Sequence, residues 1–70
     1  MKVTKQLNGF DCNIGDGVLL LGGEEFRAKS VRKTVQKGSE LKIYIFDFIY
    51  VIKFNSEDEA TNFNVKVNKY

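Results

Sequence analysis

The sequence predicts an α+β fold: a small antiparallel β-sheet or partly open barrel of about three to five strands, ending in one C-terminal helix. Three observations predict it. The run Leu41–Phe54 is rich in β-branched and aromatic residues and contains no glycine or proline. Turn-forming residues divide the first half of the chain into short segments. A helix-capping signal begins at Ser56. Because 70 residues suffice for one core only, residues 1–70 are expected to form a single domain.

The first third of the chain alternates between short apolar segments and turn formers. Met1–Leu7 alternates weakly and is interpreted as a short edge strand. Asn8–Gly17 is dense in Gly, Asn and Asp, which predicts a loop. Val18–Leu21 is a short apolar run that stops at Gly22-Gly23, so it predicts a strand followed by a tight turn.

The segment Glu24–Lys37 is compatible with a helix or with a strand. Acidic residues at its start and Gly38 just past its end favour a helix. Its valines and threonine favour a strand, and Lys37-Gly38-Ser39 then serves as the loop of a hairpin that joins it to the next strand. We prefer the strand and expect a β-bulge near Ser30–Val31, where the alternation slips.

The run Leu41–Phe54 is predicted to be one long strand with two apolar faces. Regular alternation puts Leu41, Ile43, Ile45, Asp47, Ile49, Val51 and Lys53 on one face. It puts Lys42, Tyr44, Phe46, Phe48, Tyr50, Ile52 and Phe54 on the other face. A short chain has little material to cover both faces. Either the sheet curls into a barrel, or a helix covers one face and a partner or second copy covers the other.

The C-terminal segment carries a specific helix-start signal. Ser56 and Glu59 match a capping box, and the residues between them are acidic. The apolar residues Ala60, Phe63, Val67 and Tyr70 then recur at helical spacing. The alternation of Phe63, Val65 and Val67 leaves a strand as the alternative.

Three segments follow one another as in a known barrel type: I-G-D-G-V-L-L, E-F-R-A-K-S-V and Y-I-F-D-F. Over about half of the chain this order resembles the strand pattern of small SH3-like barrels such as Tudor domains. The resemblance implies a partly open barrel. The aromatic cage motif of those domains is absent, so no site residue is carried over.

The composition argues against catalysis, a cofactor or a metal site. The chain has no histidine and a single cysteine, Cys12, which removes the commonest general base and leaves neither a Cys-His pair nor a zinc site. The loop Asp11–Asp16 superficially suggests calcium but fails the EF-hand spacing. We therefore expect a protein that is not an enzyme. One cysteine and no apolar segment long enough for a membrane span also lead us to expect a soluble cytoplasmic protein.

An aromatic row is the first candidate for a binding surface. It consists of Tyr44, Phe46, Phe48 and Tyr50. One interpretation is hydrophobic core with the tyrosines at its rim. The other is an apolar patch covered by a protein partner or by a second copy of the chain, because tyrosine combines apolar area with a polar tip.

A basic set is the second candidate. It consists of Arg27, Lys29, Arg32, Lys33, Lys37 and Lys42. These side chains are either a solvated face that discourages aggregation or a stripe that contacts phosphates. In the second interpretation the aromatic row would supply base stacking, although half of the cations should point away from it.

The sequence therefore favours a non-catalytic protein-interaction or regulatory module that forms a homodimer. A small phage or mobile-element protein that binds a host factor fits this description. The alternative is a nucleic-acid-binding β domain that uses the basic set and the aromatic row. The net charge of +2 supplies little long-range attraction, so nucleic-acid binding is expected to be weak.

Overall fold

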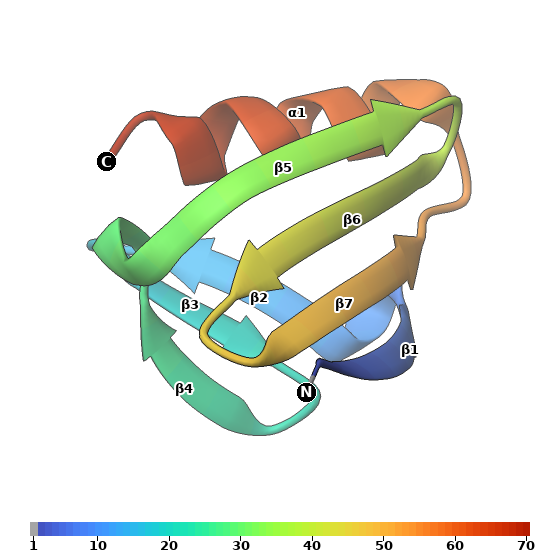
Figure 1. Cartoon of the computed structure of the whole chain (residues 1–70). Helices are drawn as coiled ribbons and strands as arrows, with labels where there is room; N and C mark the ends of the chain where they lie inside the picture. Colours follow the sequence, from blue (N-terminus) through green and yellow to red (C-terminus); the bar gives the residue numbers. More distant parts are fainter. Residues whose placement is uncertain (1) are drawn as a thin grey trace.

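A computed structural model describes residues 2–70 and confirms the α+β fold class with its C-terminal helix (Figure 1). Within these residues the chain forms seven strands and one α-helix. The strands are β1 Val3–Asn8, β2 Cys12–Gly15, β3 Val18–Leu21, β4 Glu24–Arg27, β5 Val31–Lys37, β6 Glu40–Ile45 and β7 Phe48–Lys53, and the helix is α1 Glu57–Asn68.

The strands form two sheets that pack against each other. The first has four strands in the order β1-β7-β6-β5 and is antiparallel except for β1, which runs parallel to β7 at the edge. The second has three antiparallel strands in the order β2-β3-β4. Single turns of 3₁₀ helix, Gly9–Asp11 and Ala28–Ser30, carry the chain from one sheet to the other. The three-stranded sheet lies across the four-stranded sheet in Figure 1.

Two predictions for the first half of the chain hold, and one is wrong. The edge strand at the N-terminus and the strand Val18–Leu21 are both present. The loop predicted for Asn8–Gly17 instead contains β2, which pairs with β3 across the turn Asp16-Gly17. Both turn residues have a positive φ, of 53° and 76°, as the tight hairpin turns that match strand twist require. The many turn-forming residues in this segment therefore made the short strand β2 look like part of a loop.

The prediction of one long strand over Leu41–Phe54 is wrong, because the chain reverses at Phe46-Asp47. Ile45 pairs with Phe48 across this two-residue turn, and β6 and β7 run antiparallel. A strand of that length would extend about 46 Å at the usual rise per residue. The longest dimension of the molecule is 28 Å, so a straight strand would leave its ends without a neighbouring layer.

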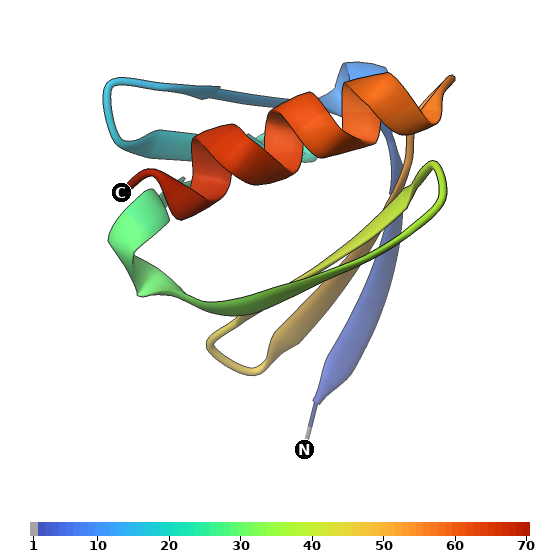
Figure 2. The same ribbon diagram turned by 90° about the horizontal axis from the view of Figure 1, so that it is seen from above.

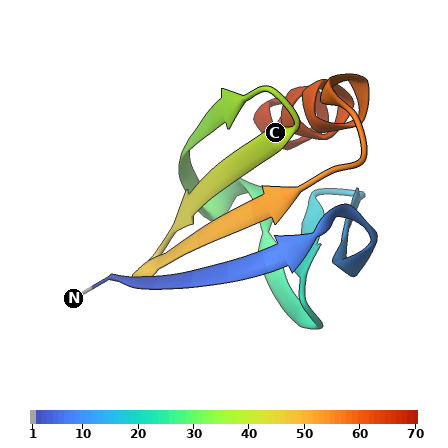
Figure 3. The ribbon, with the colours of Figure 1, turned by 90° about the vertical axis from the view of Figure 1, so that its right-hand side faces the viewer.

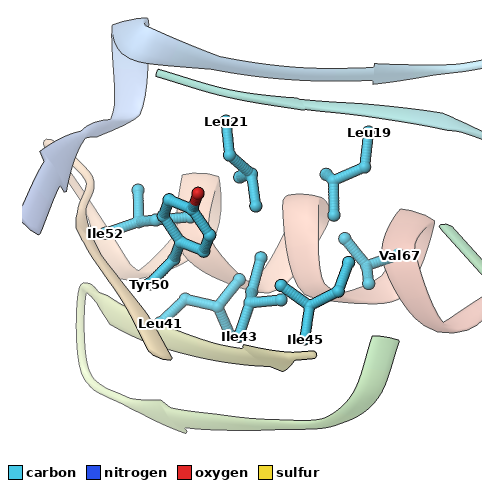
Figure 4. Close-up of a cluster of buried hydrophobic side chains, with 8 residues drawn as sticks. All are labelled: Leu19, Leu21, Leu41, Ile43, Ile45, Tyr50, Ile52 and Val67. Atoms are coloured by element: carbon cyan, nitrogen blue, oxygen red, sulfur yellow. The ribbon is translucent and has the colours of Figure 1, made fainter. Parts of the chain in front are cut away.

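The turn also exchanges the two predicted faces. The core takes Leu41, Ile43 and Ile45 from one predicted face and Tyr50 and Ile52 from the other. These five side chains point toward Leu19 and Leu21 of β3, and Val67 of α1 completes the cluster (Figure 4). The inner faces of the two sheets thus cover each other within one chain.

The strand interpretation of Glu24–Lys37 is confirmed, with an interruption close to the predicted bulge. The 3₁₀ turn Ala28–Ser30 separates β4 from β5, and the pairing of β5 with β6 shifts register between Val31 and Lys33. β5 then reverses into β6 through Gly38-Ser39, as the hairpin loop predicted.

Helix α1 begins where the capping signal placed it. The hydroxyl of Ser56 accepts a hydrogen bond from the Glu59 amide at 3.2 Å. Ala60 and Val67 are buried and Phe63 is half-buried, whereas Tyr70 at the end of the predicted stripe is exposed. The helix contacts β5, β6 and β2, and thereby covers one side of the two-sheet sandwich (Figures 2 and 3).

A polar seam joins α1 to β5. It consists of Thr34 and Gln36 on β5 and Thr61, Asn64 and Asn68 on α1. Thr34 donates to the Asn64 side-chain oxygen at 2.7 Å, and Gln36 donates to the Thr61 hydroxyl at 2.8 Å. Asn68 donates to the Thr34 hydroxyl at 3.1 Å. Asparagines that disfavour a helix by propensity therefore secure this helix to the sheet.

Candidate functional site

The structure separates the aromatic row instead of aligning it on one face. Tyr44 lies on the outer face of the four-stranded sheet, away from the core, because its neighbours Ile43 and Ile45 are buried. Phe46 lies at the tip of the β6–β7 hairpin and is 56% exposed. Phe48 and Tyr50 point inward, and Tyr50 is only 1% exposed. A continuous row of four surface rings therefore does not exist.

Three of the four rings nevertheless belong to one aromatic chain, which includes a residue that the sequence analysis overlooked. Phe26 of β4 lies 6.1 Å from Phe46 and 5.8 Å from Tyr50, measured between ring centroids. Phe48 lies 5.8 Å from Tyr50. Separations and tilts of this kind are typical of favourable aromatic pairs. The chain of rings runs from the core outward and ends at Phe46.

The exposed end of this series of aromatic rings consists of Phe26 and Phe46. Together with Val3, whose backbone is hydrogen-bonded to the turn, we call these residues the hairpin-tip surface. Val3 at the start of β1 is 46% exposed, and its amide donates to the Asp47 carbonyl at 2.8 Å. β1 therefore holds the hairpin turn in place from the side. No local signal marks Val3 or Phe26. Val3 reaches the turn because β1 pairs with β7, and Phe26 reaches Phe46 because the two sheets pack together.

The backbone at Phe46 is strained. Its φ is 51°, in the left-handed region that a bulky side chain rarely adopts. Such a conformation costs roughly 1–2 kcal/mol for an L-residue with a Cβ. Strained residues of this kind gather at functional sites more often than elsewhere.

Tyr44 is surrounded by cations. The Lys33 ammonium lies 4.7 Å from the centroid of the Tyr44 ring, and the Lys2 ammonium lies 5.4 Å from it. Lys42 projects from the same face, because it lies two residues before Tyr44 on β6. An open hollow of about 280 Å³ beside the ring is lined by Tyr44, Lys2, Lys33 and Arg32.

The basic set divides between three places. Arg32, Lys33 and Lys42 lie around Tyr44. Arg27 and Lys29 line a separate open hollow of about 540 Å³ beside the Asp16-Gly17 turn. Lys37 lies at the far end of β5, where it pairs across strands with Glu40. Lys2 is the cation that the sequence analysis missed, since the parallel pairing of β1 brings it to the sheet.

The side chains with titratable O–H or S–H groups near the core are held in their protonated form. Burial, with a contribution from the nearby Asp11 charge, raises the pKa of Cys12 from 9.0 to about 11. The thiol donates weakly to the main-chain oxygens of Gly9 and Asn8, at 3.4 and 3.5 Å. Burial, and then the Glu24 charge, raises the pKa of Tyr50, whose hydroxyl has no hydrogen-bond partner among residues 2–70. Neither group is prepared to act as a nucleophile near neutral pH.

Across residues 2–70, no helix has both the length and the apolar composition that a bilayer span requires. Comparison of the chain with protein-family models, with curated proteins and with solved structures finds no match.

Proposed function

We propose that the protein is a non-catalytic interaction module that binds a protein partner through the hairpin-tip surface. The observation that carries the proposal is Phe46, an aromatic side chain that is more than half exposed although its backbone is strained. A turn residue selected for stability alone would be glycine, asparagine or aspartate at such a φ. A large ring at this position is better explained by a contact that it makes with another molecule.

The surroundings of Phe46 suit an anchor residue. A ring held in one orientation loses little conformational freedom when it enters a pocket on a partner. Phe26 lies against Phe46 on one side, and the bond from the Val3 amide to Asp47 restrains the turn on the other. Interface hot spots are typically aromatic side chains that insert into a pocket and are surrounded by less important contacts. We therefore expect the partner to offer an apolar pocket that receives Phe46.

A photo-crosslinking amino acid at position 46 tests the proposal. In an extract of the source cells, the modified protein should form a covalent adduct with a protein, and the adduct should survive nuclease treatment. The same amino acid at position 65 is the control, because Val65 is 62% exposed on the outer side of α1 and lies outside the hairpin-tip surface.

Binding of the purified partner then provides the quantitative test. Phe46→Ser should weaken binding at least about tenfold, as removal of a hot-spot side chain does. Val65→Ser makes a comparable apolar-to-polar change elsewhere and should leave the affinity unchanged. Equal crosslinking from positions 46 and 65, or equal affinity of the two serine variants, would reject the hairpin-tip surface as the contact site.

A further inference from the structure

The outer face of the four-stranded sheet combines an apolar centre with a cationic rim. The strand register places Val35, Tyr44, Ile49 and Val51 on this face, together with Lys33 and Lys42. Tyr44 pairs with Ile49 on one side and with Lys33 on the other, and Lys42 pairs with Val51 and Val35. The apolar side chains are partly exposed, with Val35 at 44%.

The charge on this face is concentrated at the Tyr44 end. Lys2, Arg32 and Lys33 line the hollow beside the ring, and no carboxylate of residues 2–70 lines it. The acidic residue of this face, Glu40, lies at the opposite end between Lys37 and Lys53 in the register. The other carboxylates belong to the three-stranded sheet, the turns and the start of α1. The net charge of the whole chain is small, but the Tyr44 end of this face is strongly basic.

We propose that this face binds single-stranded nucleic acid. Tyr44 stacks on a base, and Lys2, Arg32, Lys33 and Lys42 contact the phosphates on either side of it. Single-strand binders combine a cationic track with aromatic rings, since every base has a face that can stack. This inference concerns a different surface from the hairpin tip and does not depend on the proposed function.

The two lysines over the Tyr44 ring do not prevent stacking. The Tyr44 ring is partly exposed, and an ammonium above such a surface ring is held only weakly. When a base occupies the ring, each lysine can turn to a neighbouring phosphate, where it gains a full charge partner and releases a counterion. The free protein therefore keeps its cations close to the positions in which they would be needed.

Charge distinguishes this occupant from a second copy of the chain. Two such faces brought together would oppose two largely cationic surfaces, because each carries several lysines and Glu40. A polyanion with planar bases complements both the rim and the ring. Ile49 and Val51, next to Tyr44 on the sheet, give the sugar and a second base an apolar surface.

Fluorescence anisotropy with labelled oligothymidylate and oligouridylate of about 12 nucleotides tests the proposal. Four phosphate contacts predict a salt slope of about −3, so the affinity should fall about 50-fold between about 50 and 200 mM salt. Arg32→Gln with Lys33→Gln should weaken binding at least tenfold and reduce the slope by about 1.4. Tyr44→Leu should weaken binding at least about fivefold, whereas Tyr44→Phe should retain it.

Matched controls separate local contacts from general charge and from unfolding. Arg27→Gln with Lys66→Gln removes the same charge from exposed sites off this face, and binding should change less than threefold. Phe46→Ser should bind the oligonucleotides as the wild type does. A thermal melt of each variant shows whether it is folded, and Tyr44→Phe serves as the reference if Tyr44→Leu is destabilised.

Three results would overturn the proposal. The first is that neither oligonucleotide binds at low salt. An acidic protein would then be the better candidate ligand for this face. The second is an equal loss of affinity in the two double glutamine variants, which would reduce the effect to net charge. The third is equal affinity of folded Tyr44→Leu and Tyr44→Phe, together with equal binding of heparin, which would show a polyanion contact without stacking.

Discussion

The positive φ of Phe46 reverses the usual ranking of alanine and glycine at one position. Phe46→Ala and Phe46→Gly both remove the ring and its contact with Phe26. Only glycine adopts a φ of 51° without strain. We expect Phe46→Gly to be more stable than Phe46→Ala by about 1 kcal/mol in urea unfolding. The same pair of substitutions at Asp47, whose φ is not positive, should not show this preference for glycine. An alanine variant as stable as the glycine variant would show that position 46 is unstrained.

The protonated thiol of Cys12 should make the stability of the protein fall at high pH. The folded state binds the thiol proton more tightly than the unfolded state, because burial raises the pKa of Cys12 from 9.0 to about 11. The resulting stabilisation is fully present below pH 9 and is lost as the pH rises from 9 toward about 11. Because other groups also titrate there, the measurement is the difference in unfolding free energy between the wild type and Cys12→Ala. This difference should change in favour of the alanine variant over that range, and a constant difference would contradict the prediction.

At the scale of elements, Ser56 should contribute to the stability of α1. Its hydroxyl satisfies the Glu59 amide, which has no partner within the helix. Ser56→Ala should therefore cost about 1 kcal/mol in the free energy of unfolding. Ser39→Ala is the matched control, because Ser39 is exposed in the β5–β6 turn. Equal stability of the two alanine variants would show that the capping bond contributes nothing.

Elements with a local chemical signal could be predicted from the sequence, and elements without one could not. Ser56 predicts the start of the helix because its side chain caps the adjacent backbone. Gly22-Gly23 and Gly38 predict turns because they adopt the positive φ that these turns require. The turn at Phe46-Asp47 has no glycine, asparagine or proline and carries Asp47 as its single turn-forming residue, so its sequence largely continues the strand pattern. The limit on strand length in a protein of this size could have revealed the turn.

The candidate surfaces could be predicted only in part, because each joins residues from distant segments. Tyr44, Lys33 and Lys42 lie on neighbouring strands of one hairpin, and their alternation puts them on one face. Lys2 reaches Tyr44 only because β1 pairs with the far side of the sheet. Phe26 reaches Phe46 only because the second sheet packs on the first. Neither contact is indicated by the residues next to it in the sequence.

For the whole molecule, the predicted homodimer remains a prediction, and the surface expected to form it changes. The predicted homodimer required an uncovered inner face of the sheet, but the inner faces of the two sheets cover each other. The hairpin-tip surface is an exposed apolar cluster that a second copy can cover when the partner is absent. Sedimentation equilibrium at micromolar concentration should then give about twice the chain mass of 8.0 kDa.

The interface can be checked by substitution. Phe46→Ser should return the protein to the mass of one chain, whereas Val65→Ser should not change the association. A wild type that sediments as a single chain throughout the concentration range would reject the homodimer.

The parallel pairing of β1 with β7 joins the first strand of the chain to the last one, and this order has a kinetic consequence. The hairpins β5–β6 and β6–β7 close through two-residue turns and can form within microseconds. β1 has to wait for β7, and contacts between distant segments form late because the loop between them must close first. The docking of β1 brings Lys2 to Tyr44 and the Val3 amide to Asp47 in the same step. A partly folded chain therefore presents neither surface in finished form, and both become complete when β1 takes its place at the edge of the sheet.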